Sequence, residues 1–347
     1  MNLIYFILII GIVIVIHELG HFVSAKKAGV YVYEFSIGMG PKIFTFHRKN
    51  DPTKYNIRLF PVGGFVSMAG EGDLDEKDIP QNERLINKSW WIRMRTMLAG
   101  ICMNFILAII IFFIIGLVSG APTNDCYVYS IEDGYPAAKE LVAGDKLIKF
   151  NGKDILSYDE LQVKLLVNNG ETATFTVEHQ DNKIDTYVIN SKKDVDQNGN
   201  ATYHYGFTIA SKTEYGFLAA LKFGFSKFFS LIYQMILILG YLIVGKISLS
   251  SLSGPIGIYN IIKESAAAGL MNLVYLLGYI SLNVGFINLL PIPAMDGGHA
   301  FFLIIEKLKG SKVDSKFENT VHNVGLILLL ILMIIISGHD IMNMFRK

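Results

Sequence analysis

The chain has 347 residues, 52% of them hydrophobic, with a mean hydropathy of +0.41 and a formal net charge of +1. This composition is typical of a membrane protein and not of a soluble enzyme. The balanced charge, with no basic stripe interleaved with aromatic residues, excludes nucleic acid as an expected partner. Two cysteines, Cys102 and Cys126, are too few for a disulfide framework.

Residues 1–25 are predicted to form a first membrane-spanning helix, retained and not removed as a signal peptide. Its apolar run ends in His17-Glu18-Leu19-Gly20-His21. Histidines four apart lie on one helical face, so both imidazoles can reach one metal ion. Glu18 lies about 100° round the helix, where it could accept a proton from a water. The alternative is that these residues only mark the helix end near the headgroups, but ionisable groups inside a membrane segment favour function.

Residues 26–95 are predicted to form a cytoplasmic loop, because they carry twelve lysines and arginines, which places the N-terminus outside. Short strand-like runs in this loop are separated by paired glycines, among them Gly63 and Gly64. This pattern predicts membrane-associated β-hairpins. Their edges must pack on protein or lie beside a substrate, because lipid cannot pair with backbone groups.

Residues 96–120 are predicted to form the second span, in which Asn104 is the one strongly polar side chain. We interpret Asn104 as a helix–helix hydrogen-bonding residue, with a catalytic role as the less favoured alternative. Residues 121–211 form an extracytoplasmic α+β insert of domain size. In it, Ser157 and Glu160 have the spacing of a capping box, which predicts a helix from Ser157 to Val167.

The remaining segments are assigned by hydropathy and charge. Residues 231–244 are apolar enough to span, but the preceding lysines favour extracytoplasmic amphipathic or interfacial helices over 212–268, with a re-entrant helix as the alternative. The third span, with an Asp-Gly motif, covers 269–300, a cytoplasmic loop covers 301–320, and the fourth span and the C-terminus cover 321–347. This count places both termini outside.

Asp296 is the only acidic residue between Glu264 and Glu306, and it follows a Pro-x-Pro break at membrane depth. A catalytic zinc needs three protein ligands and an open position, so Asp296 is the candidate third ligand beside His17 and His21. It could also cap the following helix, and both roles can hold at once. Asn288 could hydrogen-bond substrate backbone or a neighbouring helix.

The assembled motifs resemble those of the site-two protease family, most closely the bacterial regulated intramembrane zinc metalloproteases with one PDZ domain. The resemblance covers nearly the whole chain and rests on six ordered motifs: HELGH at 17–21, FSIGMGP at 35–41, RLFPVGGFVSM at 58–68, AGxxxN at 99–104, LSGPIGI at 252–258 and NLLPIPAMDGGH at 288–299.

The resemblance implies Zn²⁺ on His17, His21 and Asp296, with Glu18 as the catalytic base. It also implies that Asn288 lies near the substrate and that the hairpin around Gly63, Gly64 and Phe65 engages an unwound substrate helix. The insert would be a PDZ domain that either binds a peptide ligand or only excludes bulky ectodomains.

We therefore expect a polytopic α-helical membrane protein with four spanning segments, a membrane-associated β-hairpin region and an extracytoplasmic PDZ-like insert. We expect it in the bilayer of the bacterial cytoplasmic membrane. There it would cleave membrane-spanning segments of single-pass proteins or signal-peptide remnants, anti-sigma factors among them. A catalytically silent PDZ-bearing scaffold and a metal or proton transporter are the alternatives. The transporter is less favoured, because this sequence shows none of the internal repeats that such proteins usually have.

Overall fold

The computed structural model describes residues 1–71, 78–168, 170–195, 201–248 and 254–346. Leu252 and Ser253, which open the motif at 252–258, therefore lie outside the described residues. The chain divides into two compact units, Met1–Ile111 with Leu252–Lys347, and Phe112–Ser251. We describe each unit by itself.

The first unit is built on long apolar helices and one pair of strands. Helix α1 ends at Lys27, two residues before Gly29, whose φ of +64° cannot continue a helix. The elements of this unit are α1 (Asn2–Lys27), β1 (Val32–His47), β2 (Lys54–Met68), the short 3₁₀ helices Gln81–Glu83 and Leu85–Asn87, α2 (Trp90–Ser119, which runs on into the second unit), α5 (Pro255–Ala267), α6 (Leu270–Leu289), α7 (Asp296–Lys309) and α8 (Ser315–Arg346).

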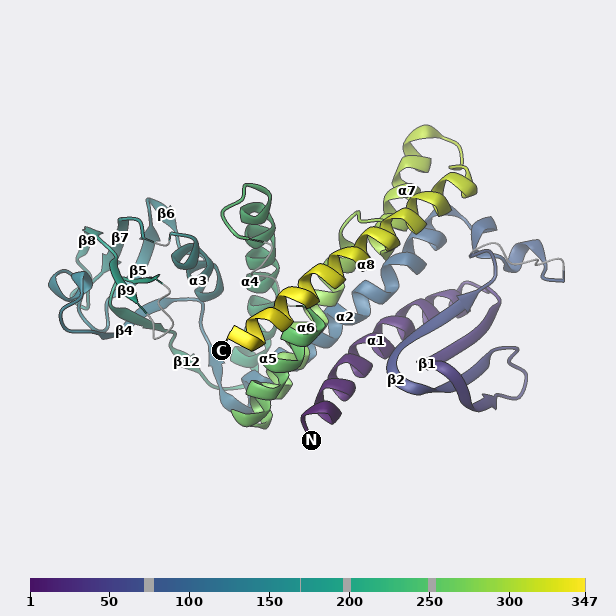
Figure 1. Ribbon diagram of the computed structural model, residues 1–347, viewed down its shortest axis with the longest axis horizontal. Helices are drawn as coiled ribbons and strands as arrows, with labels where there is room; N and C mark the ends of the chain where they lie inside the picture. The colour runs from purple at the N-terminus through teal and green to yellow at the C-terminus, as the bar shows by residue number, and fades with distance from the viewer. Residues whose placement is uncertain (72–77, 169, 196–200, 249–253, 347) are drawn as a thin grey trace. The chain divides into compact units, whose positions relative to one another are not determined.

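Strands β1 and β2 lie alongside α1 (Figure 1) and pair in an unusual register. Val32 lies opposite Met68 and His47 opposite Lys54, while Glu34 lies opposite both Ser67 and Lys54. The first half of β1 is thus flanked by both ends of β2. This half of β1 is thereby paired on both sides, as a β structure at a membrane surface requires.

A polar network holds the two strands together. Arg58 Nη2 lies 2.5 Å and Lys42 Nζ 2.8 Å from the Glu34 carboxylate, and Ser36 donates to the same group. Burial acts to raise the pKa of Glu34, but the bonds from Lys42, Ser36 and Arg58 outweigh it and hold the pKa at about 2. Glu34 is therefore ionised at neutral pH and ties β1 to β2.

The second unit contains a six-stranded sheet with the strand order β11-β4-β5-β7-β8, in which β6 pairs with β5. Helix α3 begins as predicted: the Ser157 hydroxyl accepts from the Glu160 N–H, while the Glu160 carboxylate accepts from the Leu156 N–H. The elements are β3 (Ala121–Pro122), β4 (Cys126–Ile131), the 3₁₀ helix Pro136–Lys139, β5 (Lys146–Phe150), β6 (Lys153–Asp154), α3 (Tyr158–Val167), β7 (Ala173–Glu178), β8 (Ile184–Ile189), β9 (Lys192–Val195), β10 (Ala201–His204), β11 (Phe207–Ala210), β12 (Thr213–Glu214) and α4 (Phe217–Ile243).

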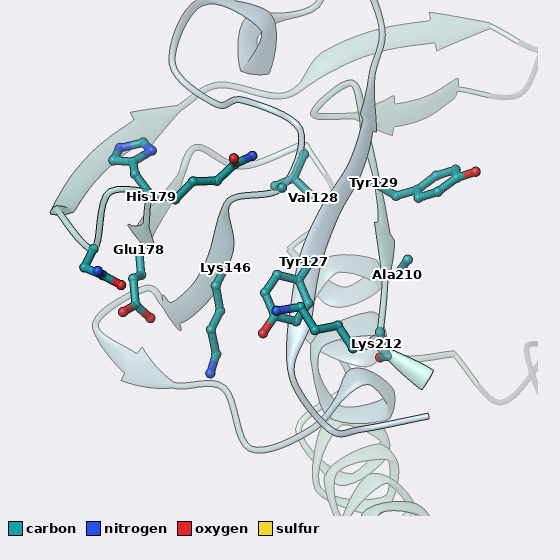
Figure 2. A pocket seen from close by; sticks show the side chains of 12 residues that line it. Tyr127, Val128, Tyr129, Lys146, Glu178, His179, Ala210 and Lys212 are labelled. Atoms are coloured by element: carbon teal, nitrogen blue, oxygen red, sulfur yellow. The ribbon is translucent and has the colours of Figure 1, made fainter. Parts of the chain in front are cut away.

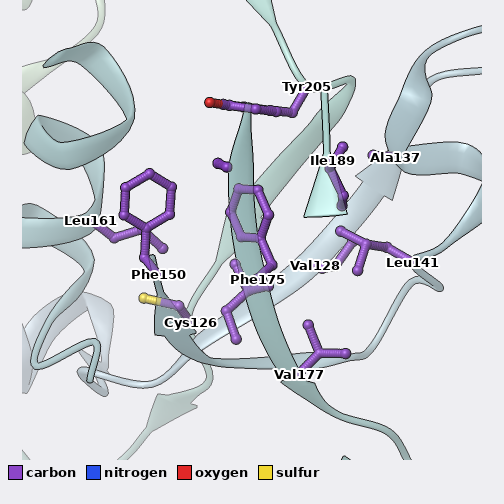
Figure 3. Close-up of a cluster of buried hydrophobic side chains, with 12 residues drawn as sticks. Cys126, Val128, Ala137, Leu141, Phe150, Leu161, Phe175, Val177, Ile189 and Tyr205 are labelled. Atoms are coloured by element: carbon purple, nitrogen blue, oxygen red, sulfur yellow. The ribbon is translucent and has the colours of Figure 1, made fainter. Parts of the chain in front are cut away.

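The core of this unit lies between the sheet and α3. Figure 3 shows Phe175 among aromatic and aliphatic side chains that point toward one another, and Phe175 and Leu161 are completely buried. Each such side chain contributes roughly 1.5–3 kcal/mol by leaving water. The insert thus has a hydrophobic core of its own, as expected of a domain.

Helix α4 is joined to α3 by a buried ion pair. Asp159, which is 8% exposed, receives hydrogen bonds from Lys227 Nζ at 2.7 and 2.9 Å and from the Ser230 hydroxyl at 2.6 Å. Lys227 and Ser230 lie near the middle of α4. The helix is therefore fastened to the insert at its centre and not only at its N-terminal end.

Among the described residues, five helices are long and apolar enough to cross a membrane: α1, α2, α4, α6 and residues 315–342 of α8. This finding confirms the prediction of a membrane protein with several spanning helices. Four of these helices correspond to the four predicted spans. The fifth is α4, the segment for which the sequence favoured an interfacial position.

Candidate metal centre

Two imidazoles and one carboxylate converge inside the first unit. His17 and His21 lie one turn apart on α1, and their Nε2 atoms are 3.2 Å apart. Asp296 Oδ2 lies 2.9 Å from Nε2 of His17 and 3.2 Å from Nε2 of His21. Asp296 is 275 residues from His21 in the sequence, so the fold and not local geometry brings the third group to the pair.

The chain reaches this point through a break between α6 and α7. Helix α6 ends at Leu289, and two prolines, Pro291 and Pro293, prevent it from continuing. Ala294 then adopts a φ of +71°, in the left-handed region, and α7 begins at Asp296. No side-chain bond of Asp296 caps α7, because the N-cap residue is Met295. The capping role that the sequence left open is therefore absent, and the carboxylate is directed at the histidines.

The spacing of the three atoms suits a zinc ion. Zinc bonds of about 2.0–2.2 Å at tetrahedral angles separate neighbouring ligand atoms by about 3.3 Å. The three separations of 2.9, 3.2 and 3.2 Å are close to this value. Three protein ligands also leave the fourth tetrahedral position open, as in a catalytic site.

The remaining ring nitrogens decide whether Nε2 can bind a cation. Nδ1 of His21 lies 2.8 Å from the backbone carbonyl oxygen of Thr96 on α2. A carbonyl only accepts, so Nδ1 carries the proton and the Nε2 lone pair is left free.

Asn104 lies at Nδ1 of His17, as the Thr96 carbonyl lies at Nδ1 of His21. Its amide nitrogen lies 3.4 Å from Nδ1 of His17, while its buried Oδ1 has no hydrogen-bond partner among the described residues. A half-turn of the amide, which is nearly symmetric in shape, places Oδ1 where it accepts the Nδ1 proton of His17. Both rings then present Nε2 to the same point.

Two glycines allow α2 to approach so closely. A Cβ on Gly20 would lie 2.3 Å from the carbonyl oxygen of Ala99, and a Cβ on Gly100 would lie 2.3 Å from Nε2 of His21. Any larger side chain at either position must displace backbone or a candidate ligand. Both glycines belong to motifs noted in the sequence, but their reason is visible only in the packing.

Glu18 lies beside the three converging groups. Its carboxylate interacts electrostatically with His17, His21 and Asp296, and it accepts a hydrogen bond from the backbone N–H of Val66 on β2. A Cβ on Gly64 would lie 3.5 Å from Cγ of Glu18. Strand β2 therefore passes directly beside the candidate base.

Of the other predicted substrate-binding residues, Gly63 and Phe65 lie on β2 itself, and Asn288 precedes the break between α6 and α7. Gly63 has a φ of +93° and packs on Met39, and the guanidinium of Arg58 lies 4.9 Å over the ring of Phe65. Asn288 is half-buried in the last turns of α6, and its amide has no hydrogen-bond partner among the described residues.

A second group of His and Glu side chains lies nearby. Nδ1 of His299 lies 3.1 Å from Oε1 of Glu318, and Nε2 of His322 lies 3.9 Å from the same oxygen. This group also meets the distance requirement for a metal ion. The two imidazoles stack, with ring centroids 3.7 Å apart.

The second unit carries a groove of about 760 Å³ on its sheet, shown in Figure 2. Tyr127, Lys146 and Glu178 reach it from β4, β5 and β7, and Lys212 lies over the Tyr127 ring at 4.4 Å. Lys146 is also paired with Asp125 at 2.9 Å. The groove therefore presents charged and aromatic side chains of the insert, and none of its lining residues belongs to the candidate metal centre.

Two imidazoles and a carboxylate on an apolar helix, with a distant aspartate brought beside them, are the features of a membrane-embedded metallopeptidase. The protein belongs to peptidase family M50, whose family model matches residues 5–332.

The chain is 30% identical to the regulator of sigma-W protease RasP of Bacillus subtilis over an alignment of 422 positions, gaps included, which covers 99% of each chain. It is 34% identical to a putative zinc metalloprotease of Clostridium acetobutylicum over 345 residues, covering 98% of this chain and 97% of that protein. The solved PDZ domain of an SdrC-like protein from Listeria monocytogenes shares 25% identity over 25% of this chain and 88% of its own, with a TM-score of 0.22. Family and relatives confirm the expectation of an intramembrane zinc metalloprotease that uses Zn²⁺.

Proposed function

We propose that His17, His21 and Asp296 bind the catalytic zinc and that Glu18 is the catalytic base. One observation carries this assignment: two Nε2 atoms and one carboxylate oxygen from distant parts of the chain lie within 3.2 Å of one another. The acceptors of the Nδ1 protons support it, because they leave both lone pairs directed at the same point.

When bound, the zinc ion supplies a Lewis acid that polarises a carbonyl group and acidifies a water. Glu18 accepts the proton of the attacking water and passes it to the leaving amine of the cleaved peptide bond. The Val66 N–H holds the Glu18 carboxylate in place for both transfers. The free amide of Asn288 hydrogen-bonds the substrate backbone.

The substrate is a membrane-spanning segment that must first be unwound, because the carbonyls of a helix are already hydrogen-bonded. The β2 stretch Gly63-Gly64-Phe65 holds the unwound segment extended by adding it as a strand next to Glu18. Single-pass regulators such as anti-sigma factors, and signal-peptide remnants, are the substrates in this proposal. The name of the Bacillus relative, a regulator of sigma-W protease, supports a regulatory substrate.

Four helices cross the cytoplasmic membrane in this proposal, namely α1, α2, α6 and α8, with both termini outside. The Asp159–Lys227 pair supports the exclusion of α4: it fastens the middle of α4 to a water-soluble domain, which cannot enter the hydrocarbon core. The insert is a PDZ-like module on the outer face. One helix on a small sheet, with the short strand β11 at the sheet edge, supports peptide binding by strand addition.

Exchange of the base tests the proposal. Glu18→Gln keeps the size of the side chain but cannot accept a proton, so we expect turnover of a single-pass substrate in liposomes to fall about 10²–10⁴-fold. The zinc content should stay unchanged. Glu264→Gln, at an exposed position on α5, is the matched control and should cleave like the wild type. Undiminished turnover by Glu18→Gln would refute the assignment of the base.

A further inference from the structure

The loop that carries Asp296 is held by a side chain from the last helix. Nδ1 of His322 on α8 accepts a hydrogen bond of 2.8 Å from the backbone N–H of Ala294. Ala294 has a φ of +71°, which a residue with a Cβ adopts only when its surroundings impose it. His322 is 8% exposed, so water does not compete freely for this bond.

Close packing of α8 confines the same loop. A Cβ on Gly325, one turn along α8 from His322, would lie 2.3 Å from Cβ of Pro293. A Cβ on Gly298 would lie 2.5 Å from the carbonyl oxygen of Ile292 and 3.1 Å from Cε1 of His322. The backbone on both sides of Asp296 is thus packed against α8 and against itself.

We propose that His322 is a positioning residue for the metal centre: its Nδ1 fixes Ala294 in the left-handed conformation from which Asp296 reaches His17 and His21. The inference rests on the proposed role of Asp296 as a metal ligand. It assigns α8, which supplies no ligand, a part in holding the zinc.

The same bond excludes His322 Nε2 as a ligand of a second metal ion. An N–H group only donates, so Nδ1 must use its lone pair to accept from Ala294, and the proton of the neutral ring is then on Nε2. A protonated nitrogen cannot bind a cation. This Nε2–H is buried, has no hydrogen-bond partner among the described residues, and lies 3.9 Å from Glu318. The cluster of His299, Glu318 and His322 is therefore a support for the loop.

Three variants test the inference in the purified, zinc-loaded full-length protein. His322→Phe keeps the ring that stacks on His299 but removes the acceptor, whereas His322→Asn restores an acceptor at the position of Nδ1. Glu318→Gln leaves the Ala294 bond intact and removes the carboxylate that a second metal would need. Zinc retention is measured by dialysis against a graded series of a competing chelator, and kcat and KM are measured separately.

We expect His322→Phe to lose zinc at about 10–100-fold lower chelator concentration, as is usual when a group that orients a ligand is removed. His322→Asn should recover most of this loss, and Glu318→Gln should keep one zinc ion per chain at wild-type affinity. In His322→Phe, kcat should fall while KM stays nearly constant, because the substrate strand is untouched.

Zinc retention of His322→Phe equal to that of the wild type would overturn the inference, as would a second zinc that Glu318→Gln removes. Failure of His322→Asn to improve on His322→Phe would also contradict it, because a purely structural loss of packing is not repaired by an acceptor. Asp296→Ala distinguishes a failure of the proposed metal centre from a failure of the inference about His322. If this variant keeps its zinc, the proposed metal centre is wrong and the inference falls with it. If it loses zinc while His322→Phe keeps it, only the inference is wrong.

Discussion

Two clusters, each of two histidines and one carboxylate, lie close together in this protein, and in the proposed assignment only one of them binds a metal ion. His17, His21 and Asp296 form one, and His299, Glu318 and His322 form the other. Both bring two imidazoles and a carboxylate within 4.8 Å. They differ in what the second nitrogen of a histidine meets: a carbonyl oxygen for His21, and a backbone N–H for His322.

This difference determines where the proton sits on each ring. The carbonyl of Thr96 forces the proton of His21 onto Nδ1 and leaves Nε2 free, while the N–H of Ala294 forces the proton of His322 onto Nε2. Distance between donor atoms is therefore a necessary but insufficient criterion for a metal site. In the proposed assignment, the outer hydrogen bonds decide which cluster binds the ion and which one supports the loop before α7.

The largest effect within this comparison is expected from Gly100→Ala. The added Cβ would lie 2.3 Å from Nε2 of His21 and 2.9 Å from Nε2 of His17, so either α2 or both rings must move. We expect loss of zinc binding and of activity, and a decrease in the free energy of unfolding of about 1–3 kcal/mol. Zinc content and thermal unfolding in detergent measure this.

Gly240→Ala on α4 is the matched control, because a Cβ there meets no atom within 4 Å. It should leave zinc binding unchanged and stabilise the helix by about 0.5–1 kcal/mol. A Gly100→Ala protein with a full zinc content would show that α2 is not packed on the metal centre in this way.

A smaller effect is expected from changes at Asn104, which test whether the proton of His17 is on Nδ1. Asn104→Leu removes the acceptor for Nδ1 of His17 and should lower zinc affinity about 10–100-fold. Asn104→Asp keeps only acceptor atoms at the same place and should retain most of the affinity. The reverse order, with Asn104→Asp the weaker binder, would mean that the amide nitrogen and not the oxygen faces His17.

The local part of the site could be predicted from the sequence, whereas its support could not. The four-residue spacing of His17 and His21 fixes their common face on any helix, and Asp296 could be found because acidic residues are rare at membrane depth. The capping alternative for Asp296 was wrong. For Asn104 we favoured a helix–helix bond over a catalytic role, and the structure places its amide against a ring nitrogen of His17.

The hydrogen bonds that orient the candidate ligands could not be predicted from any pattern in the sequence. The acceptor for His21 is a backbone carbonyl, which any residue at position 96 would supply. The role of His322 depends on the positive φ of an alanine 28 residues away, and no property of Ala294 in the sequence indicates that conformation. For α4, apolar composition alone fits a span, and the opposing argument comes from the buried Asp159–Lys227 pair.

The central claim is that one zinc ion is held jointly by the first helix and the break before α7. Zinc K-edge X-ray absorption of the purified full-length protein, combined with zinc stoichiometry for the wild type and Asp296→Ala, tests it most directly. The account predicts one zinc per chain with two imidazole nitrogens and a carboxylate oxygen in its coordination shell, and loss of the ion in Asp296→Ala. An ion that stays bound without Asp296, or a second ion on His299 and His322, would contradict it.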